Sequence, residues 1–263
     1  MPGADDELTH LPGPLARRLA SRHLLPSQER PVLTTLSVLA LVLASACWMV
    51  GDALIVGFRK PDSTRYSEFI AFMGDDTYAF YTRVNDARLR AGALVANYAA
   101  PLWLVGLYSQ WLLLRHSPWA VPVVAVLGVG FVLQPLAHAA FYPVALASER
   151  VWTLFQADPD APGTLAAAQH ARRLRAFLLQ AWVPSVGLLV LGWLAVAVLI
   201  TTGQTPLPWW AALLTPVPQA LPWSQLPKVP YPGRPLLDGA LFNTVSLVWG
   251  LSLLFLSSVY PLA

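Results

Sequence analysis

Few side chains in this sequence could do acid–base chemistry in apolar surroundings, and Asp52 is foremost among them. Asp52 is the only charged residue of a long apolar run, Pro31 to Phe58. A carboxyl group at such a place is costly unless it is paired or protonated, so it points to a functional site. If neutral, it could serve as a proton donor. The candidates for a charged or titratable partner are Arg90, Arg172 and His138.

A second group of reactive side chains has the spacing of one helix face. Gln134, His138 and Tyr142 follow one another at intervals of four, which places them on one stripe of a helix. His138 could act as the partner of Asp52 or as a base. It could also be a neutral core histidine bonded to Gln134 or to a backbone carbonyl group. Tyr142, followed by Pro143, could equally be an anchor at the membrane interface.

The other site candidates are amides and tryptophans within apolar runs. Amides at membrane depth can orient a substrate, but they also serve as interhelical hydrogen-bond partners. Tryptophans could shape a pocket and shield a developing cation, although any packed apolar bundle contains them. Counting residues from the helix ends places most of the polar groups in the half of the bilayer near the end of the first run. The amide and tryptophan candidates are Trp48, Asn97, Gln180, Trp182, Asn243 and Trp249.

The elements that must position these groups are predicted by the composition, which is 56% hydrophobic and 12% charged. Five apolar runs reach the roughly 20 residues needed to span a bilayer. We therefore expect an all-α fold, a polytopic transmembrane helical bundle of about six helices, with residues 31–263 as one domain. The five runs are Pro31 to Phe58, Ala91 to Leu114, Val121 to Leu146, Phe177 to Thr202 and Leu236 to Tyr260.

The sixth crossing depends on Pro206 to Trp223, which contains five prolines. This segment is either a kinked span or a broken, partly interfacial hairpin. The long connections carry further expectations. Residues 59–87 are rich in aromatic and charged side chains and predict an interfacial helix or a lid. Residues 149–170 contain DPDAPG, which predicts a solvated loop and a helix start near Thr164.

The polar tail, residues 1–30, has no apolar core of a signal peptide. Its residues 14–25 could form a basic amphipathic helix on the membrane surface, or the whole tail could be disordered. The protein is expected to be a multi-pass membrane protein, and the family resemblance described below implies the bacterial inner (plasma) membrane. The tail itself predicts no catalytic group.

Several classes of function find no support in the residues. The net charge of +3 is too small to indicate nucleic acid as a partner, and the one cysteine, Cys47, cannot form an internal disulfide. The histidines and acids show no metal-ligand spacing, and no nucleotide-binding motif occurs. We therefore expect neither a metal nor a cofactor. The expected partners are membrane lipid and a lipophilic small molecule, and the sequence leaves the oligomeric state open.

Three short motifs resemble those of an uncharacterised bacterial multi-pass membrane family, a domain of unknown function. They are Gly51-Asp52 with Gly57, His138-Ala-Ala-Phe141-Tyr142-Pro143, and Gly239-Ala-Leu-Phe-Asn243. The resemblance covers most of residues 31–260 and implies a six-helix membrane fold with no established activity. At the level of fold alone, the chain is similar to the emopamil-binding-like sterol isomerases and the small membrane terpene cyclases.

Two functional hypotheses follow from these observations. The first is an intramembrane enzyme that cyclises or isomerises an isoprenoid or sterol-like molecule, with Asp52 as the acid and His138 as its partner or base. The second is a non-enzymatic binder, carrier or assembly subunit that holds a lipophilic ligand in the same polar pocket. A transporter is less favoured, because no internal repeat is visible.

Overall fold

The structure is a computed structural model, and it describes residues 29–56, 61–82, 85–225 and 234–262. The amphipathic helix considered for residues 14–25 lies outside the described residues. Within the described part every regular element is a helix, and there is no strand. The all-α prediction is therefore confirmed.

Five long helices form the bundle, and each is long and apolar enough to cross a membrane. The prediction of a multi-pass helical membrane protein is confirmed by these helices, although two of them are much longer than the predicted spans. Charged and polar residues continue both of those helices beyond their apolar parts. The five are α2 (Glu29–Val56), α4 (Asp86–Leu114), α5 (Ala120–Ala157), α6 (Pro162–Thr201) and α8 (Arg234–Val259).

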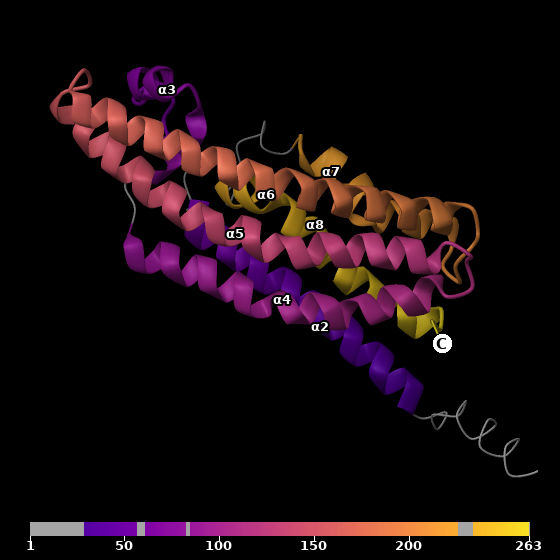
Figure 1. The fold of residues 1–263 in the computed structure, drawn as a ribbon. Helices are drawn as coiled ribbons and strands as arrows, with labels where there is room; N and C mark the ends of the chain where they lie inside the picture. Colours follow the sequence, from indigo (N-terminus) through magenta and orange to yellow (C-terminus); the bar gives the residue numbers. More distant parts are fainter. Residues whose placement is uncertain (1–28, 57–60, 83–84, 226–233, 263) are drawn as a thin grey trace, which may run out of the picture.

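The helices lie side by side (Figure 1). α2, α4, α5 and α6 alternate in direction, and α8 runs antiparallel to α2, in the same direction as α6. We call the end of the bundle where α2 ends and α4 begins the proximal end, and the end where α4 gives way to α5 the distal end. α5 has 38 residues and α6 has 40. At the rise of an α-helix they are about 60 Å long, roughly twice the thickness of a hydrocarbon core. The α5–α6 hairpin therefore extends well past the proximal end of its neighbours (Figure 1).

The proline-rich segment does not form a continuous spanning helix. It forms two short helices, η3 (Trp209–Leu214) and α7 (Pro216–Trp223), joined at Thr215. Prolines at the helix starts lack the amide hydrogen that a longer helix would need, which explains the interruption. α6 ends at the distal end, whereas α8, antiparallel to α2, starts at the proximal end. The chain must therefore return between α6 and α8, and the proline-rich segment forms the first part of that return. Of the two forms considered for it, the broken one is observed.

A small unit covers the extended part of the α5–α6 hairpin, and we call it the covering segment (residues 61–82). It contains α3 (Ser67–Met73) and the 3-10 helix η2 (Asp76–Tyr81). Its aromatic side chains pack on α5, with the ring of Phe69 5.0 Å from that of Trp152. Arg175 of α6 forms an ion pair with Asp75, and Arg172 donates to the carbonyl oxygen of Phe72 at 2.6 Å. The segment predicted as an interfacial helix or lid thus contains two short helices held on the hairpin.

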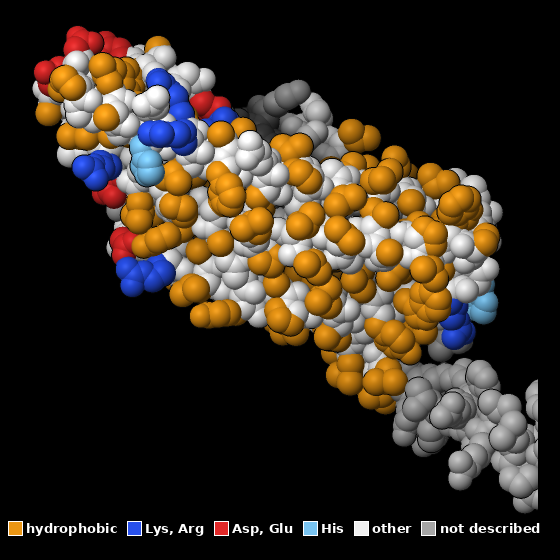
Figure 2. Space-filling view, in the orientation of Figure 1, with side chains coloured by type: hydrophobic (Ala, Val, Ile, Leu, Met, Phe, Trp, Pro, Cys, Tyr) orange, Lys and Arg blue, Asp and Glu red, His pale blue; other side chains and the backbone are white. Residues whose placement is uncertain are grey.

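The surface has a broad apolar zone and a charged end (Figure 2). Hydrophobic side chains cover the bundle, while Lys, Arg, Asp and Glu gather mainly around the proximal end and the tip of the hairpin. Leu36, Val132 and Phe255 are all more than half exposed, as expected for side chains that face lipid.

Candidate acid–base site

Three polar side chains from three helices meet inside the proximal half of the bundle. Asn243 of α8 donates a hydrogen bond from its amide nitrogen to Oδ2 of Asp52 on α2, at 2.6 Å. His138 of α5 places Nε2 3.3 Å from the other carboxyl oxygen, Oδ1. The structure therefore brings together three of the candidate residues, Asp52, His138 and Asn243. Each comes from a different span, so the cluster forms only when α2, α5 and α8 are assembled.

A close helix crossing fixes the backbone next to Asp52. A Cβ atom added to Gly51 would lie 2.9 Å from the Cβ of Ala96 and 2.9 Å from the carbonyl oxygen of Gly92, both on α4. The same atom would lie 3.3 Å from Cε1 of His138. Only a residue without a side chain lets α2, α4 and the imidazole ring approach so closely. Gly51 therefore sets the position from which Asp52 reaches His138.

The cluster is largely removed from solvent. The side chain of His138 is 3% exposed, while that of Asp52 is 15% exposed. The indole ring of Trp48, one turn before Asp52, lies 4.9 Å from the imidazole ring, centre to centre. Neither ring nitrogen of His138 makes a hydrogen bond to another described residue, so the contact with Asp52 is a close approach of poor hydrogen-bond geometry. The imidazole thus retains its hydrogen-bonding capacity beside a carboxyl group.

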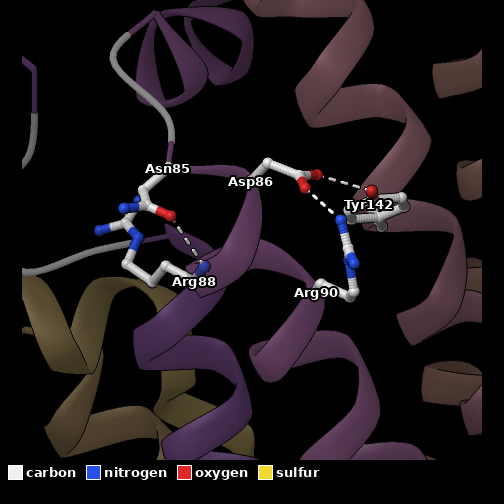
Figure 3. Close-up of polar contacts among 5 residues, drawn as sticks. All are labelled: Asn85, Asp86, Arg88, Arg90 and Tyr142. Carbon is white, nitrogen blue, oxygen red and sulfur yellow. Dashed lines mark hydrogen bonds and ion pairs between the residues drawn. The ribbon is translucent and has the colours of Figure 1, made fainter.

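One turn closer to the proximal end, Tyr142 has a partner outside the cluster. Its hydroxyl donates to Oδ1 of Asp86 on α4 at 2.6 Å, and Arg90 pairs with the other oxygen of Asp86 (Figure 3). Asn85 caps the start of α4 by accepting from the amide of Arg88 (Figure 3). Tyr142 therefore links α5 to α4 above the cluster. Arg90, considered as a partner of Asp52, is paired with Asp86 instead.

The remaining predicted residues lie at several different places. Gln134 is buried one turn below His138, and Asn97 is half-buried beside the Gly51 contact, with its carbonyl oxygen unpartnered. Gln180 and Trp182 are exposed on the outer face of α6, so the structure does not bring them to the cluster. Trp249 is fully buried and packs against Trp193, whose ring centre lies 6.3 Å away, in the main apolar core.

Tyr81 is a residue near the site that the sequence did not single out as a site residue. It ends η2, is 1% exposed and belongs to an apolar cluster with Ile55 and Leu89. Ile55 lies three residues after Asp52, on the same side of α2. Burial raises the pKa of the Tyr81 phenol, the negative charge of Asp52 adds to the rise, and Arg175 opposes it. Tyr81 therefore packs on α2 within one turn of Asp52, through its contact with Ile55.

The arrangement suits proton transfer rather than metal binding. No group of three or more His, Cys, Asp or Glu side chains within the described ranges could hold a metal ion. A carboxyl group that accepts a hydrogen bond on one oxygen keeps the other free to carry a proton. In this site the free oxygen is the one that faces His138. A carboxyl group and an imidazole at this separation could exchange a proton with each other or with a bound molecule.

Fold and site together define a polytopic helical membrane protein with an acid–imidazole–amide cluster inside its bundle. Comparison with known families finds a match over residues 34–261 with DUF6796, a family of unknown function. The chain belongs to that family. The resemblance to an uncharacterised membrane family is thereby supported at this level. No curated protein and no solved structure matches the chain.

Proposed function

We propose that the protein is an intramembrane enzyme that isomerises or cyclises a lipophilic molecule, such as an isoprenoid or sterol-like compound, by acid–base chemistry. The observation that carries the proposal is the meeting of Asp52, His138 and Asn243 at one buried point. A carboxyl group is rarely kept in the interior of a membrane bundle without a function. Here it has both a fixed orientation and a titratable neighbour.

The roles of the three residues follow from their contacts. The amide of Asn243 holds Oδ2, so the proton of a neutral Asp52 resides on Oδ1. Asp52 would donate that proton to one carbon of a double bond and leave a carbocation on the other. Loss of a proton from a neighbouring carbon to His138 would restore a double bond, which is an isomerisation. Capture of the cation by a second double bond before that loss would give a ring, and in both reactions the numbers of atoms and charges balance.

The setting supports the proposal in two ways. A dry interior strengthens the attraction between a developing cation and the carboxylate left after proton transfer. The ring face of an indole also favours a cation, and Trp48 lies beside the cluster. We assign the protein to the bacterial plasma membrane on the basis of its motif resemblance, and the analogy with sterol isomerases and terpene cyclases is one of architecture.

The test is incorporation of solvent deuterium into a lipid. Purified protein in vesicles of phosphatidylethanolamine and phosphatidylglycerol, supplied with an isoprenoid lipid extract, is incubated in D₂O, and the neutral lipids are compared by mass spectrometry. The wild-type protein should produce an isomer that carries one deuterium, and Asp52→Asn should produce none. Asp160→Asn, which changes an exposed carboxyl group in the loop between α5 and α6, is the control and should retain turnover. Retained turnover in Asp52→Asn would eliminate the proposed role.

A non-enzymatic binder is the second candidate, and the apolar grooves favour it. A groove of about 350 Å³ at the distal end is lined by Trp119, Leu191 and Val198, among others. It lies far from Asp52 and has the apolar lining that suits an acyl or isoprenoid chain. Extraction of lipids from the purified protein separates the two candidates. A ligand that is returned chemically unchanged by both wild type and Asp52→Asn supports the binder.

A further inference from the structure

Tyr81 lies where the covering segment meets the bundle. Its side chain is 1% exposed and packs in the cluster that contains Ile55 of α2, Leu89 of α4 and Val144 of α5. Its phenol is therefore inserted among the helices that carry Asp52 and His138, although it comes from outside the five spans. No other covering-segment residue belongs to that cluster except the partly buried Phe80, among the residues described.

The hydroxyl group of Tyr81 donates to none of the described side chains or carbonyl groups. A buried tyrosine hydroxyl usually has a hydrogen-bond partner, because an unpaired donor costs free energy. Burial raises the pKa of the phenol, so it remains a neutral donor whether Asp52 is protonated or ionised. His138, which lies beside Asp52, also has ring nitrogens that are buried and unpartnered. The Tyr81 hydroxyl and the His138 imidazole thus both lack a hydrogen-bond partner among the described residues.

We propose that Tyr81 completes the Asp52 site, and that its hydroxyl and His138 bind the hydroxyl or carbonyl oxygen of an uncharged lipophile. This inference builds on the proposed function and specifies the class of substrate. Three of the nearby arginines favour an uncharged group, because they already have partners, whereas the Nε atom of Arg88 on α4 has none among the described residues. Arg90 is paired with Asp86, Arg175 with Asp75, and Arg172 with backbone carbonyl groups.

The covering segment determines where the hydroxyl lies. Asp75 accepts from the amide of Thr77 at 2.8 Å, which starts η2, and Arg175 holds the same carboxylate against α6. Tyr81 is therefore fixed through a side chain about 100 residues away in sequence. Tyr78 lies one turn earlier on the same helix, is 2% exposed and faces Phe69 and Val151 in another cluster. It provides a matched tyrosine outside the site.

The experiment measures binding and does not depend on turnover. Full-length protein in nanodiscs is titrated with farnesol, with farnesane as the hydrocarbon of the same chain, and with farnesyl phosphate. The wild-type protein should bind farnesol more tightly than the other two probes. In Tyr81→Phe, the farnesol affinity should fall about tenfold, the effect of losing one buried hydrogen bond, while farnesane binding should not change. Tyr78→Phe should bind farnesol as the wild type does.

Three outcomes would overturn the inference. They are an unchanged farnesol affinity in Tyr81→Phe, an equal loss for farnesol and farnesane, and tighter binding of farnesyl phosphate than of farnesol by the wild type. An equal loss for both neutral probes would mean that Tyr81 acts only in packing. Retained turnover in Asp52→Asn would end the proposed enzyme mechanism without affecting this binding result. The failure of either proposal can therefore be recognised separately.

Discussion

Asn243 and Asp52 are 191 residues apart in the sequence, yet they share a hydrogen bond of 2.6 Å that joins α8 to α2. The contact is half-buried and lies in the proximal half of the bundle. Its position means that the last span helps to fix the one carboxyl group of the first span. The stability of the bundle and the orientation of Asp52 therefore depend on the same side chain.

Asn243→Ala should weaken both the stability of the bundle and the fixed orientation of Asp52. Removal of the amide leaves Oδ2 of Asp52 without its donor, which should lower the free energy of unfolding by about 1–3 kcal/mol. Thermal unfolding in detergent measures the loss. The control is Thr244→Ala, because the Thr244 hydroxyl bonds to the carbonyl oxygen of Ala240 within its own helix. If the two variants lose equal stability, the hydrogen bond does not link the helices as described.

Gly51→Ala should separate α2 from α4. The new Cβ would lie 2.9 Å from both the Ala96 Cβ and the Gly92 carbonyl oxygen, so the helices must move apart. Overpacking of this kind costs about 1–3 kcal/mol. Gly187→Ala is the matched control, since nothing lies within 4 Å of its added Cβ. Thermal unfolding should show a loss for the first variant and none for the second, and equal melting temperatures would contradict the packing.

Arg175→Gln should loosen the covering segment. It removes the cation from a partly buried pair with Asp75, and hydrogen bonds to charged groups contribute about 1.5–3 kcal/mol. Hydrogen exchange of residues 67–81 should quicken by about tenfold or more if the segment opens locally. Arg173→Gln, at an exposed neighbouring position, should leave the exchange unchanged. Unchanged protection in Arg175→Gln would show that the aromatic contacts alone hold the segment.

Alkaline pH should destabilise the covering segment through its buried phenols. Burial raises the pKa of Tyr78 and of Tyr81 above their ordinary value of 10.0. The folded protein therefore holds these protons more tightly than the unfolded chain, and stability falls as the pH rises above about 10. The melting temperature is measured about one pH unit below and about one pH unit above that value. Between these two points Tyr81→Phe should lose less melting temperature than the wild type. An identical pH dependence in the variant would mean that Tyr81 is not buried.

The sequence could predict the spans and the depth of the polar residues, but not the direction in which each side chain points. Hydropathy reports whether a segment prefers lipid, so the five apolar helices were predictable. Counting along each span gave the height of Asp52, His138 and Asn243, and these three do meet. Gln180 has a similar predicted height but is exposed on α6. Rotation about a helix axis depends on tertiary packing, which a nearly uniform apolar run does not specify.

Tyr81 and the long hairpin show the other limit. The position of Tyr81 depends on contacts between the covering segment and α6, especially Asp75 with Arg175, and no local pattern encodes that pairing. The extension of α5 to Ala157 was also underestimated, because the charged part beyond Leu146 does not resemble a membrane span. Helices that leave the bilayer continue on local propensity and on packing between them.

The glycines at the contacts of α2 with α4 and α8 limit which residues can replace one another at these positions within the family. Gly51 and Gly92 touch across the α2–α4 crossing, and an added Cβ at Gly239 of α8 would lie 3.0 Å from Val56. The backbone of α2 thus contacts that of α4 directly, and only the Val56 side chain separates it from α8 at Gly239. A larger residue at one of these positions can be accommodated only if its neighbour becomes smaller. Relatives of this chain should therefore show paired, size-compensating exchanges at these contacts, even where the lipid-facing residues have diverged freely.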